Sequence, residues 1–188
     1  MRPGDDRVRK GYKRAVPTPA NADAVLVTGV YGAGKSAVVA DIGALLGDRG
    51  ERYGLLDVDW LGWFDSGIST REHRRAVLGN IATVSSGFLI AGGRRLALAW
   101  SVRDRAQLDE VRLALPVPLQ VVRLEVSLAL VEQRLSADPT AERQGDDLRV
   151  AREWLAAGHG VGLEDLLLPG DAPVRQTSEA ICSWLDWI

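Results

Sequence analysis

The eight residues Gly29-Val-Tyr-Gly-Ala-Gly-Lys-Ser36 constrain this chain more than any other segment. They match the pattern G-x-x-x-x-G-K-[ST] at every fixed position, and a chain of this composition, with 20 glycines, is expected to contain about 0.003 such matches by chance. An apolar run over 24–28 precedes the pattern and an amphipathic segment over 36–46 follows it. This order predicts a strand, a glycine loop whose backbone N–H groups surround a phosphate, and a helix whose positive end adds to the attraction.

The rest of the chain alternates short apolar runs with helical periodicity, which is typical of an α/β domain. Further strands are predicted over 53–58, 95–102, 119–126 and 172–175, and helices over 104–115, 127–135, 148–157 and 177–188. Residues 60–93 are predicted to hold short helices, with 76–90 the most helical part. Connections of this length predict parallel strands, so the expected fold is a three-layer α/β domain with a five-stranded parallel sheet.

Length and composition fit one globular domain preceded by a short arm. The chain has 188 residues, of which 46% are hydrophobic, and no apolar run approaches the roughly 18 residues of a membrane span. The net charge of −2 argues against bulk nucleic-acid binding. Residues 1–22 are interpreted as a disordered basic arm and 23–188 as the domain. The polar beginning lacks the apolar core of a secretion signal, which favours a cytoplasmic protein.

The loop itself supplies the candidate nucleotide-binding residues, and ATP and Mg²⁺ are the expected cofactors. Lys35 is expected to bind β- and γ-phosphate oxygens, which makes it a candidate catalytic residue, and the Ser36 hydroxyl is expected to ligate Mg²⁺. The complete set of nucleotide-binding candidates is Gly29, Val30, Tyr31, Gly32, Ala33, Gly34, Lys35, Ser36 and Ala37.

The loop and the layout of residues 23–188 resemble the P-loop NTPase superfamily, and within it the small kinases that act on adenylate, gluconate, shikimate and adenylylsulfate. That resemblance implies a sheet order of 2-3-1-4-5. Motor and translocation ATPases normally end the third strand in an acid, where Ala99 or Trp100 stands here. Translational GTPases carry Asn-Lys-x-Asp, which this sequence lacks. Both absences favour the small kinases, some of which take the acid from the second strand.

Two aspartates close the predicted second strand in Leu56-Asp-Val-Asp59. Because they alternate with Val58, both carboxylates are expected on one side, at the end of the sheet where ligands bind. The pattern looks like the Asp-x-Asp of shikimate- and gluconate-type kinases. It implies that Asp57 holds Mg²⁺ through water and that Asp59 contacts the substrate hydroxyl as a catalytic residue. The alternative is a pair of aspartates that only cap or turn the chain.

Aromatic residues and an arginine are the remaining candidates for the acceptor side. Trp60 and Trp63 follow the aspartates and either line the site, where they would stack on a ring, or anchor flap helices in the core. Arg103 falls in a segment that faintly resembles an arginine-containing motif of adenylate kinases, which implies anion binding at the acceptor site; a surface arginine is the alternative.

Arg134 precedes, and Arg143 lies within, a polar segment over about 136–147 that looks like the lid of these kinases. The resemblance implies that both neutralise charge on the transferred phosphoryl group; two solvated arginines are the alternative.

The function that these observations favour is transfer of the γ-phosphoryl group of Mg-ATP to a hydroxyl or phosphate of a small molecule. The expected partner is that acceptor, with no nucleic acid and no membrane, and its identity stays open. The acceptor pocket is predicted beyond strands two and three, walled by the flap over about 60–93, with Asp59 and Arg103 converging on it and Trp60 or Trp63 along its side. The alternatives are a nucleotide-binding switch or accessory ATPase that acts through protein partners, and an inactive kinase.

Overall fold

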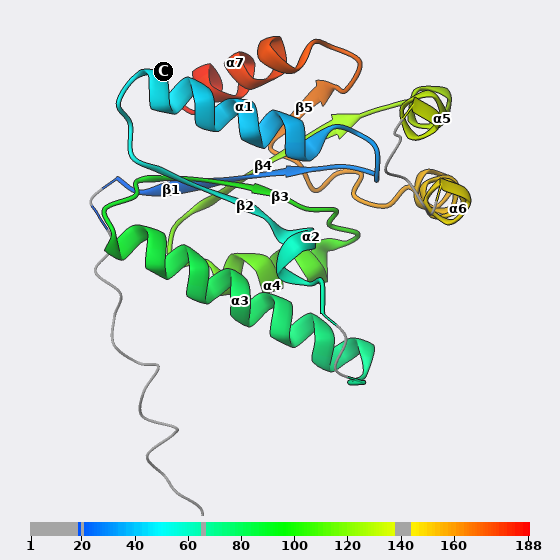
Figure 1. The fold of residues 1–188 in the computed structure, drawn as a ribbon, viewed down its shortest axis with the longest axis horizontal. Helices are drawn as coiled ribbons and strands as arrows, with labels where there is room; N and C mark the ends of the chain where they lie inside the picture. Colours follow the sequence, from blue (N-terminus) through cyan, green and yellow to red (C-terminus); the bar gives the residue numbers. More distant parts are fainter. Residues whose placement is uncertain (1–18, 20, 65–66, 138–143) are drawn as a thin grey trace, which may run out of the picture.

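Five parallel strands form the middle layer of the protein (Figure 1). The computed structural model describes residues 19, 21–64, 67–137 and 144–188. The strands lie in the order β2-β3-β1-β4-β5, and every neighbouring pair is parallel. They are β1 (Asp23–Thr28), β2 (Tyr53–Asp57), β3 (Arg95–Ala99), β4 (Leu119–Glu125) and β5 (Leu166–Pro169). The predicted fold class and strand order are confirmed.

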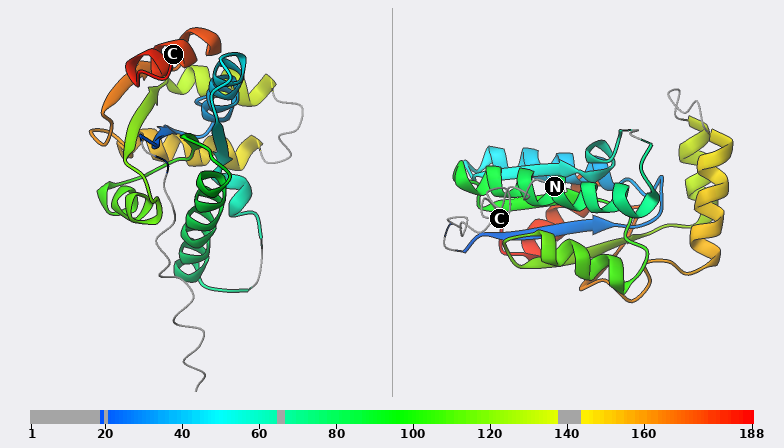
Figure 2. Two further views of the ribbon diagram at one scale, coloured as in Figure 1. Left: turned by 90° about the vertical axis from the view of Figure 1, so that its left-hand side faces the viewer. Right: turned by 90° about the horizontal axis from the view of Figure 1, so that it is seen from below.

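Helices cover both faces of the sheet (Figures 1 and 2). On one face α1 (Lys35–Asp48) packs against α7 (Val174–Trp184), and on the other α3 (Thr70–Ile90) packs against α4 (Arg105–Ala114). The short α2 (Val58–Leu61) follows β2 directly. The pair α5 (Leu128–Ala137) and α6 (Gln144–Ala156) lies beyond the carboxyl end of β4, on the side where β1 enters the glycine loop (Figure 1).

The apolar run at 24–28 forms most of the central strand β1. Val25 and Val27 pack in the core between the sheet and α1, whereas Ala24 and Leu26 pack on the opposite side. All four side chains are fully buried, because a parallel sheet is covered on both faces. This rigid strand fixes the position of the loop that follows Thr28.

The fifth strand is not where the sequence predicted it. The prediction over 172–175 is wrong: β5 is Leu166–Pro169, and α7 begins at Val174 directly after Pro173. Leu166 to Leu168 pair with β4, whose partners start at Val122. Proline at the start of a helix is favoured because its missing N–H has no intrahelical partner there, so Pro173 marks a helix start rather than a strand.

The flap region also differs from its prediction. Instead of several short helices, residues 70–90 form one helix of 21 residues. Its start is fixed by a capping box, in which the Ser69 hydroxyl accepts from the Glu72 N–H and the Glu72 carboxylate accepts from the Ser69 N–H at 3.0 Å. No helix in the described residues is long and apolar enough to cross a membrane. Most of the predicted arm, residues 1–18 and 20, lies outside the described residues, and Ala22 is buried.

Candidate functional site

The glycine loop between β1 and α1 has a backbone that requires glycine. Gly29, Gly32 and Gly34 have φ angles of 145°, 80° and 95°. A Cβ atom on Gly29 would lie 2.8 Å from the carbonyl oxygen of Leu124, so no side chain fits there. The loop therefore turns tightly over the end of β1 and delivers the chain into the first turn of α1.

Lys35 begins α1 and points back into the loop. Its side chain is buried, and Nζ donates a hydrogen bond of 3.0 Å to the carbonyl of Val30. Burial lowers the pKa of Lys35 to about 8, and the nearby carboxylates of Asp59 and Asp57 oppose this shift. Among the described residues, no carboxylate forms an ion pair with Lys35, although the charges of Asp59 and Asp57 act on it.

The two aspartates belong to different elements, Asp57 to β2 and Asp59 to α2. The expectation of one continuous strand is wrong, because β2 ends at Asp57 and the buried Val58 begins α2. The Asp57 carboxylate caps α2 by accepting the N–H of Asp59 at 3.2 Å. Partial burial raises the pKa of Asp59, and the Lys35 charge works against that rise. Both carboxylates still act on Lys35, and in the sheet Asp57 lies directly beside Ala99, at the end of β3.

Arg134, near the end of α5, contacts the loop through the backbone. Its Nη1 donates to the carbonyls of Ala33 and Gly32 at 3.0 and 3.3 Å, and Nη2 donates to Gly170 at 2.7 Å. The predicted lid arginine therefore joins the glycine loop to the segment after β5. Arg143, the second predicted lid arginine, lies outside the described residues.

A cavity of about 230 Å³, the loop cavity, collects the residues that the motif predicted. The exposed Ser36 and Ala37 line it beside the buried Lys35. Its complete lining is Tyr31, Gly32, Gly34, Lys35, Ser36, Ala37, Asp59, Arg134 and Leu135. Hydroxyl, carboxylate and ammonium groups thus share one opening with the N-terminus of α1. This combination fits a nucleotide phosphate chain with Mg²⁺, which prefers oxygen ligands and few of them from the protein.

A second cavity, the α3 cavity, also has Asp59 in its lining. Its volume is about 260 Å³, and Asp59 is the one residue in both described linings. The α3 cavity is lined by Val58, Asp59, Gly62, Thr70, His73, Arg74, Val77 and Trp100. His73 and Arg74 had no predicted role, because their helix could not be placed against the aspartates from sequence. The predicted flap does wall a pocket beside Asp59.

A third cavity, the β5 cavity, lies across Arg134 from the loop cavity. It has a volume of about 190 Å³. Residues after β5 and at the start of α7 face the start of α1 across it, and they are mostly small and apolar. The described lining is Ala33, Gly34, Ala37, Val38, Leu124, Arg134, Gly170, Ala172, Val174 and Thr177, and it contains no acidic side chain.

Arg103 does not join Asp59 in either of these cavities. Its guanidinium lies over the ring of Trp154, 5.6 Å from the ring centroid. Trp154 in turn contacts His159 edge-on and lines a separate cavity of about 200 Å³ beside Gly29. The structure thus does not bring Arg103 and Asp59 together as predicted, because the buried indole of Trp154 on α6 binds the arginine instead.

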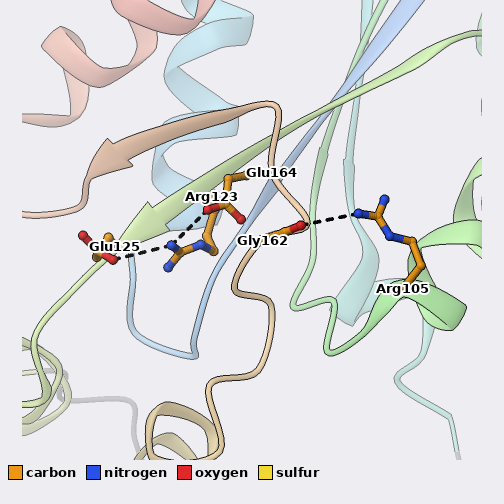
Figure 3. Close-up of polar contacts among 5 residues, drawn as sticks. All are labelled: Arg105, Arg123, Glu125, Gly162 and Glu164. Carbon is orange, nitrogen blue, oxygen red and sulfur yellow. Dashed lines mark hydrogen bonds and ion pairs between the residues drawn. The ribbon is translucent and has the colours of Figure 1, made fainter.

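The chain around this separate cavity is held by polar contacts of Arg123 and Arg105 (Figure 3). Arg123 on β4 reaches between Glu164, at 3.1 Å, and Glu125, at 3.5 Å. Arg105 donates to the carbonyl of Gly162 at 3.4 Å. These contacts attach the segment between α6 and β5 to β4 and α4, so their role is to hold the frame around the glycine loop.

The two tryptophans of the flap lie on the surface. Trp60 and Trp63 are 66% and 77% exposed, and their ring centroids lie 4.9 Å apart. Neither residue lines one of the cavities described above. They are therefore not core anchors, and a place at the rim of the α3 cavity remains a prediction from their position on either side of Gly62.

Comparison with known proteins gives a family match for the first part of the chain. The family described as methylmalonyl Co-A mutase-associated GTPase MeaB matches residues 5–73, which is less than half of the chain. A search of curated proteins found no match.

Solved structures of similar fold cover nearly the whole chain. The adenylylsulfate (APS) kinase of Mycobacterium tuberculosis, in complex with AMPPNP and APS, is 19% identical with a TM-score of 0.62, over 89% of this chain and 99% of that one. A gluconokinase from Sinorhizobium meliloti gives 19% and 0.63, over 89% and 93%. Shikimate kinase from Bacteroides thetaiotaomicron gives 12% and 0.60, over 87% and 98%.

The strand order, the loop between β1 and α1, and these similarities place the chain in the P-loop NTPase superfamily. Its three-layer domain has the kinase-like form of that fold, with a sheet in the order 2-3-1-4-5.

Proposed function

We propose that the protein is an ATP-dependent kinase that transfers the γ-phosphoryl group to a small molecule. The observation that carries this proposal is the position of Asp59 between two cavities. The loop cavity would hold the phosphate chain, and the α3 cavity would hold the acceptor. A phosphoryl transfer needs donor and acceptor on opposite sides of the reacting phosphorus, and a carboxylate at the boundary can orient the attacking hydroxyl.

Each residue of the loop cavity has a role that follows from its chemistry. Lys35 would donate to the β- and γ-phosphate oxygens in place of the Val30 carbonyl that it contacts. Asp59 would accept the proton of the acceptor hydroxyl, which its raised pKa favours. Arg134 would keep the loop carbonyls turned outward, so that the loop N–H groups face the phosphates.

Mg²⁺ would enter with the nucleotide, and it would neutralise charge on the phosphate oxygens. The Ser36 hydroxyl is exposed in the loop cavity and is the protein ligand that we expect. Asp57 lies beside Ala99 at the position where an acid from β3 is missing, so its carboxylate would hold the metal's water.

The base would occupy the β5 cavity, which adjoins the loop cavity at Arg134. A guanine would leave its N1–H and amino donors without a carboxylate partner in this lining, and the sequence has no Asn-Lys-x-Asp motif. We therefore infer ATP rather than GTP as the nucleotide.

A nucleotide-binding switch or accessory NTPase is the second candidate. The specific observation that favours it is the match of residues 5–73 to a family described as an associated GTPase. A switch would respond to a protein partner and would not need a small-molecule cavity beside Asp59.

The test uses γ-labelled ATP with small-molecule and protein fractions of a cell extract, added separately. A kinase should transfer label to a small molecule, and Asp59→Asn should reduce that transfer by about 100-fold or more while ATP affinity changes little. Asp57→Asn keeps a good helix cap and should lose activity that high Mg²⁺ partly restores. Asp48→Asn, at the exposed end of α1, is the control. Stimulation of ATP or GTP hydrolysis by the protein fraction alone would refute the kinase proposal in favour of the switch.

A further inference from the structure

Ser101, two residues after the end of β3, contacts the glycine loop and has no role in the proposed reaction. Its Oγ donates a hydrogen bond of 2.8 Å to the carbonyl oxygen of Gly29. Ser101 is half-buried and does not belong to the described lining of the loop cavity. A hydroxyl that lies outside the cavity and binds the backbone of the loop can act on a bound phosphate only through that backbone.

The carbonyl of Gly29 belongs to the peptide group that leads into Val30. Because a planar trans peptide turns as one unit, a donor that holds this oxygen also fixes the direction of the Val30 N–H. Gly29 has a φ angle of 145° and no side chain to restrict its rotation, so the hydrogen bond selects one orientation of a permissive backbone. The carbonyl of the following peptide, that of Val30, accepts Nζ of Lys35 at 3.0 Å. Ser101 therefore acts one peptide away from the acceptor of the loop lysine.

Other hydrogen bonds fix the chain on either side of Ser101. The N–H of Trp100 donates to the carbonyl of Val27 at 3.2 Å. The N–H of Val102 donates to Oγ1 of the buried Thr28 at 3.0 Å. These bonds hold the backbone of the segment and do not involve the Ser101 side chain. They therefore place the hydroxyl beside Gly29, and they remain when the hydroxyl is removed.

Phosphate binding would change which side chains hold this part of the loop. In the free protein, Ser101 and Lys35 both donate to loop carbonyls. A bound phosphate chain would draw Nζ of Lys35 away from Val30. Among the described residues, Ser101 then supplies the remaining side-chain hydrogen bond to Gly29 and Val30. The hydroxyl thus stabilises the phosphate-bound loop more than the free loop, and only such a difference changes an affinity.

We propose that Ser101 is a positioning residue for phosphate binding, whose hydroxyl keeps the peptide between Gly29 and Val30 in the orientation that a bound phosphate chain requires. This rests on the nucleotide site of the proposed function, and it depends neither on the acceptor nor on phosphoryl transfer. Ser101 acts through the loop backbone and touches neither the nucleotide nor the metal.

The test measures the affinity of inorganic tripolyphosphate and of Mg-ATP by titration calorimetry. Ser101→Ala should weaken both ligands by a similar factor of about three to ten, because one hydrogen bond is lost from the bound state. Ser101→Thr and Ser101→Val have the same shape and differ in the hydroxyl, so the threonine variant should bind tripolyphosphate about three-fold or more tighter than the valine variant. Thr83→Ala is the control, because it removes a hydroxyl that donates to another backbone carbonyl, that of Gly79 on the exposed side of α3.

Unchanged tripolyphosphate affinity in Ser101→Ala, or equal affinities in Ser101→Thr and Ser101→Val, would overturn the inference. A loss in Thr83→Ala as large as that in Ser101→Ala would also overturn it. Thermal unfolding shows which variants are folded at the temperature of the titration, and Ser101→Ala decides the question if the larger side chains do not fit. A wild-type protein that does not bind tripolyphosphate would refute both this inference and the nucleotide site. Binding without transfer of label to a small molecule would refute the kinase proposal alone.

Discussion

The buried charge of Lys35 lowers the stability of the folded protein. Its side chain is only 6% exposed, and its pKa of about 8 lies below the ordinary 10.5 because burial outweighs the attraction of Asp59 and Asp57. At neutral pH the protonated form is therefore stabilised less in the folded state than in the unfolded chain. A phosphate chain in the loop cavity would supply the missing negative charge, which explains why a functional loop tolerates this arrangement.

Replacing Lys35 with methionine should separate function from stability. We expect Lys35→Met to abolish ATP binding and to raise the free energy of unfolding at pH 7 by about 1–3 kcal/mol. Because the folded-state pKa of Lys35 is lowered, its buried charge destabilises the wild type fully below pH 8. This destabilisation disappears as the pH rises toward 10.5, where Lys35 is neutral in both the folded and the unfolded protein. Denaturant unfolding of both proteins between pH 7 and 10.5 measures this. A methionine variant less stable than wild type at pH 7 would contradict it.

At the scale of elements, three chain segments meet at Arg134. The end of α5 carries the guanidinium, which donates to the glycine loop and to Gly170 after β5. It also lies in the linings of both the loop cavity and the β5 cavity. We therefore expect Arg134 to act as a positioning residue that links the proposed base site to the proposed phosphate site, rather than as an arginine that reaches in only from a closing lid.

Three ligands can distinguish these roles. If Arg134 holds the loop, Arg134→Lys should weaken inorganic tripolyphosphate and ATP by a similar factor of about ten, because lysine cannot span three carbonyls. A purely base-contacting arginine would affect ATP and adenosine but not tripolyphosphate. A purely lid-type arginine would lower turnover and leave all three affinities unchanged. Titration calorimetry gives the affinities, and the exposed Arg149→Lys on α6 is the control.

At the scale of the whole molecule, the frame around the loop depends on buried charge. Arg123 is 11% exposed and joins β4 to Glu164, which is 14% exposed and lies just before β5. Burial is the largest single influence on Glu164 and would raise its pKa, but the hydrogen bond and charge of Arg123 together with backbone hydrogen bonds outweigh it, and the pKa is lowered. The pair therefore stabilises the fold above the ordinary glutamate pKa, and this contribution is lost as the pH falls below about 4.5.

Two glutamates on the same arginine offer a matched comparison. Glu164→Gln should lower the free energy of unfolding by about 2–4 kcal/mol at pH 7, since it leaves a buried guanidinium without its main partner. Glu125→Gln, at a position 62% exposed, should cost less than about 1 kcal/mol. ATP affinity should be unchanged in both at temperatures where they are folded. Equal losses of stability would show that Arg123 does not distinguish the two partners.

The sequence alone determined the parts that depend on local pattern. The phosphate loop, the buried run of β1 and the helix that starts at Lys35 follow from residue spacing, because a glycine at a positive φ angle and an apolar strand leave few alternatives. The same holds for the start of α4, which was predicted at 104, where the Asp104 carboxylate accepts the N–H of Gln107 at 2.8 Å.

Tertiary structure decided which distant residues share a site. Nothing in the local sequence shows that Arg103 lies over Trp154, or that His73 and Arg74 line one cavity with Asp59, because these arrangements depend on how α3, α6 and the sheet pack. The fifth strand was misplaced for the same reason: Leu166–Pro169 is a strand because β4 offers it an edge. Spacing along the chain fixes backbone conformation within a few residues, whereas the pairing of side chains from different elements is set by packing of the core.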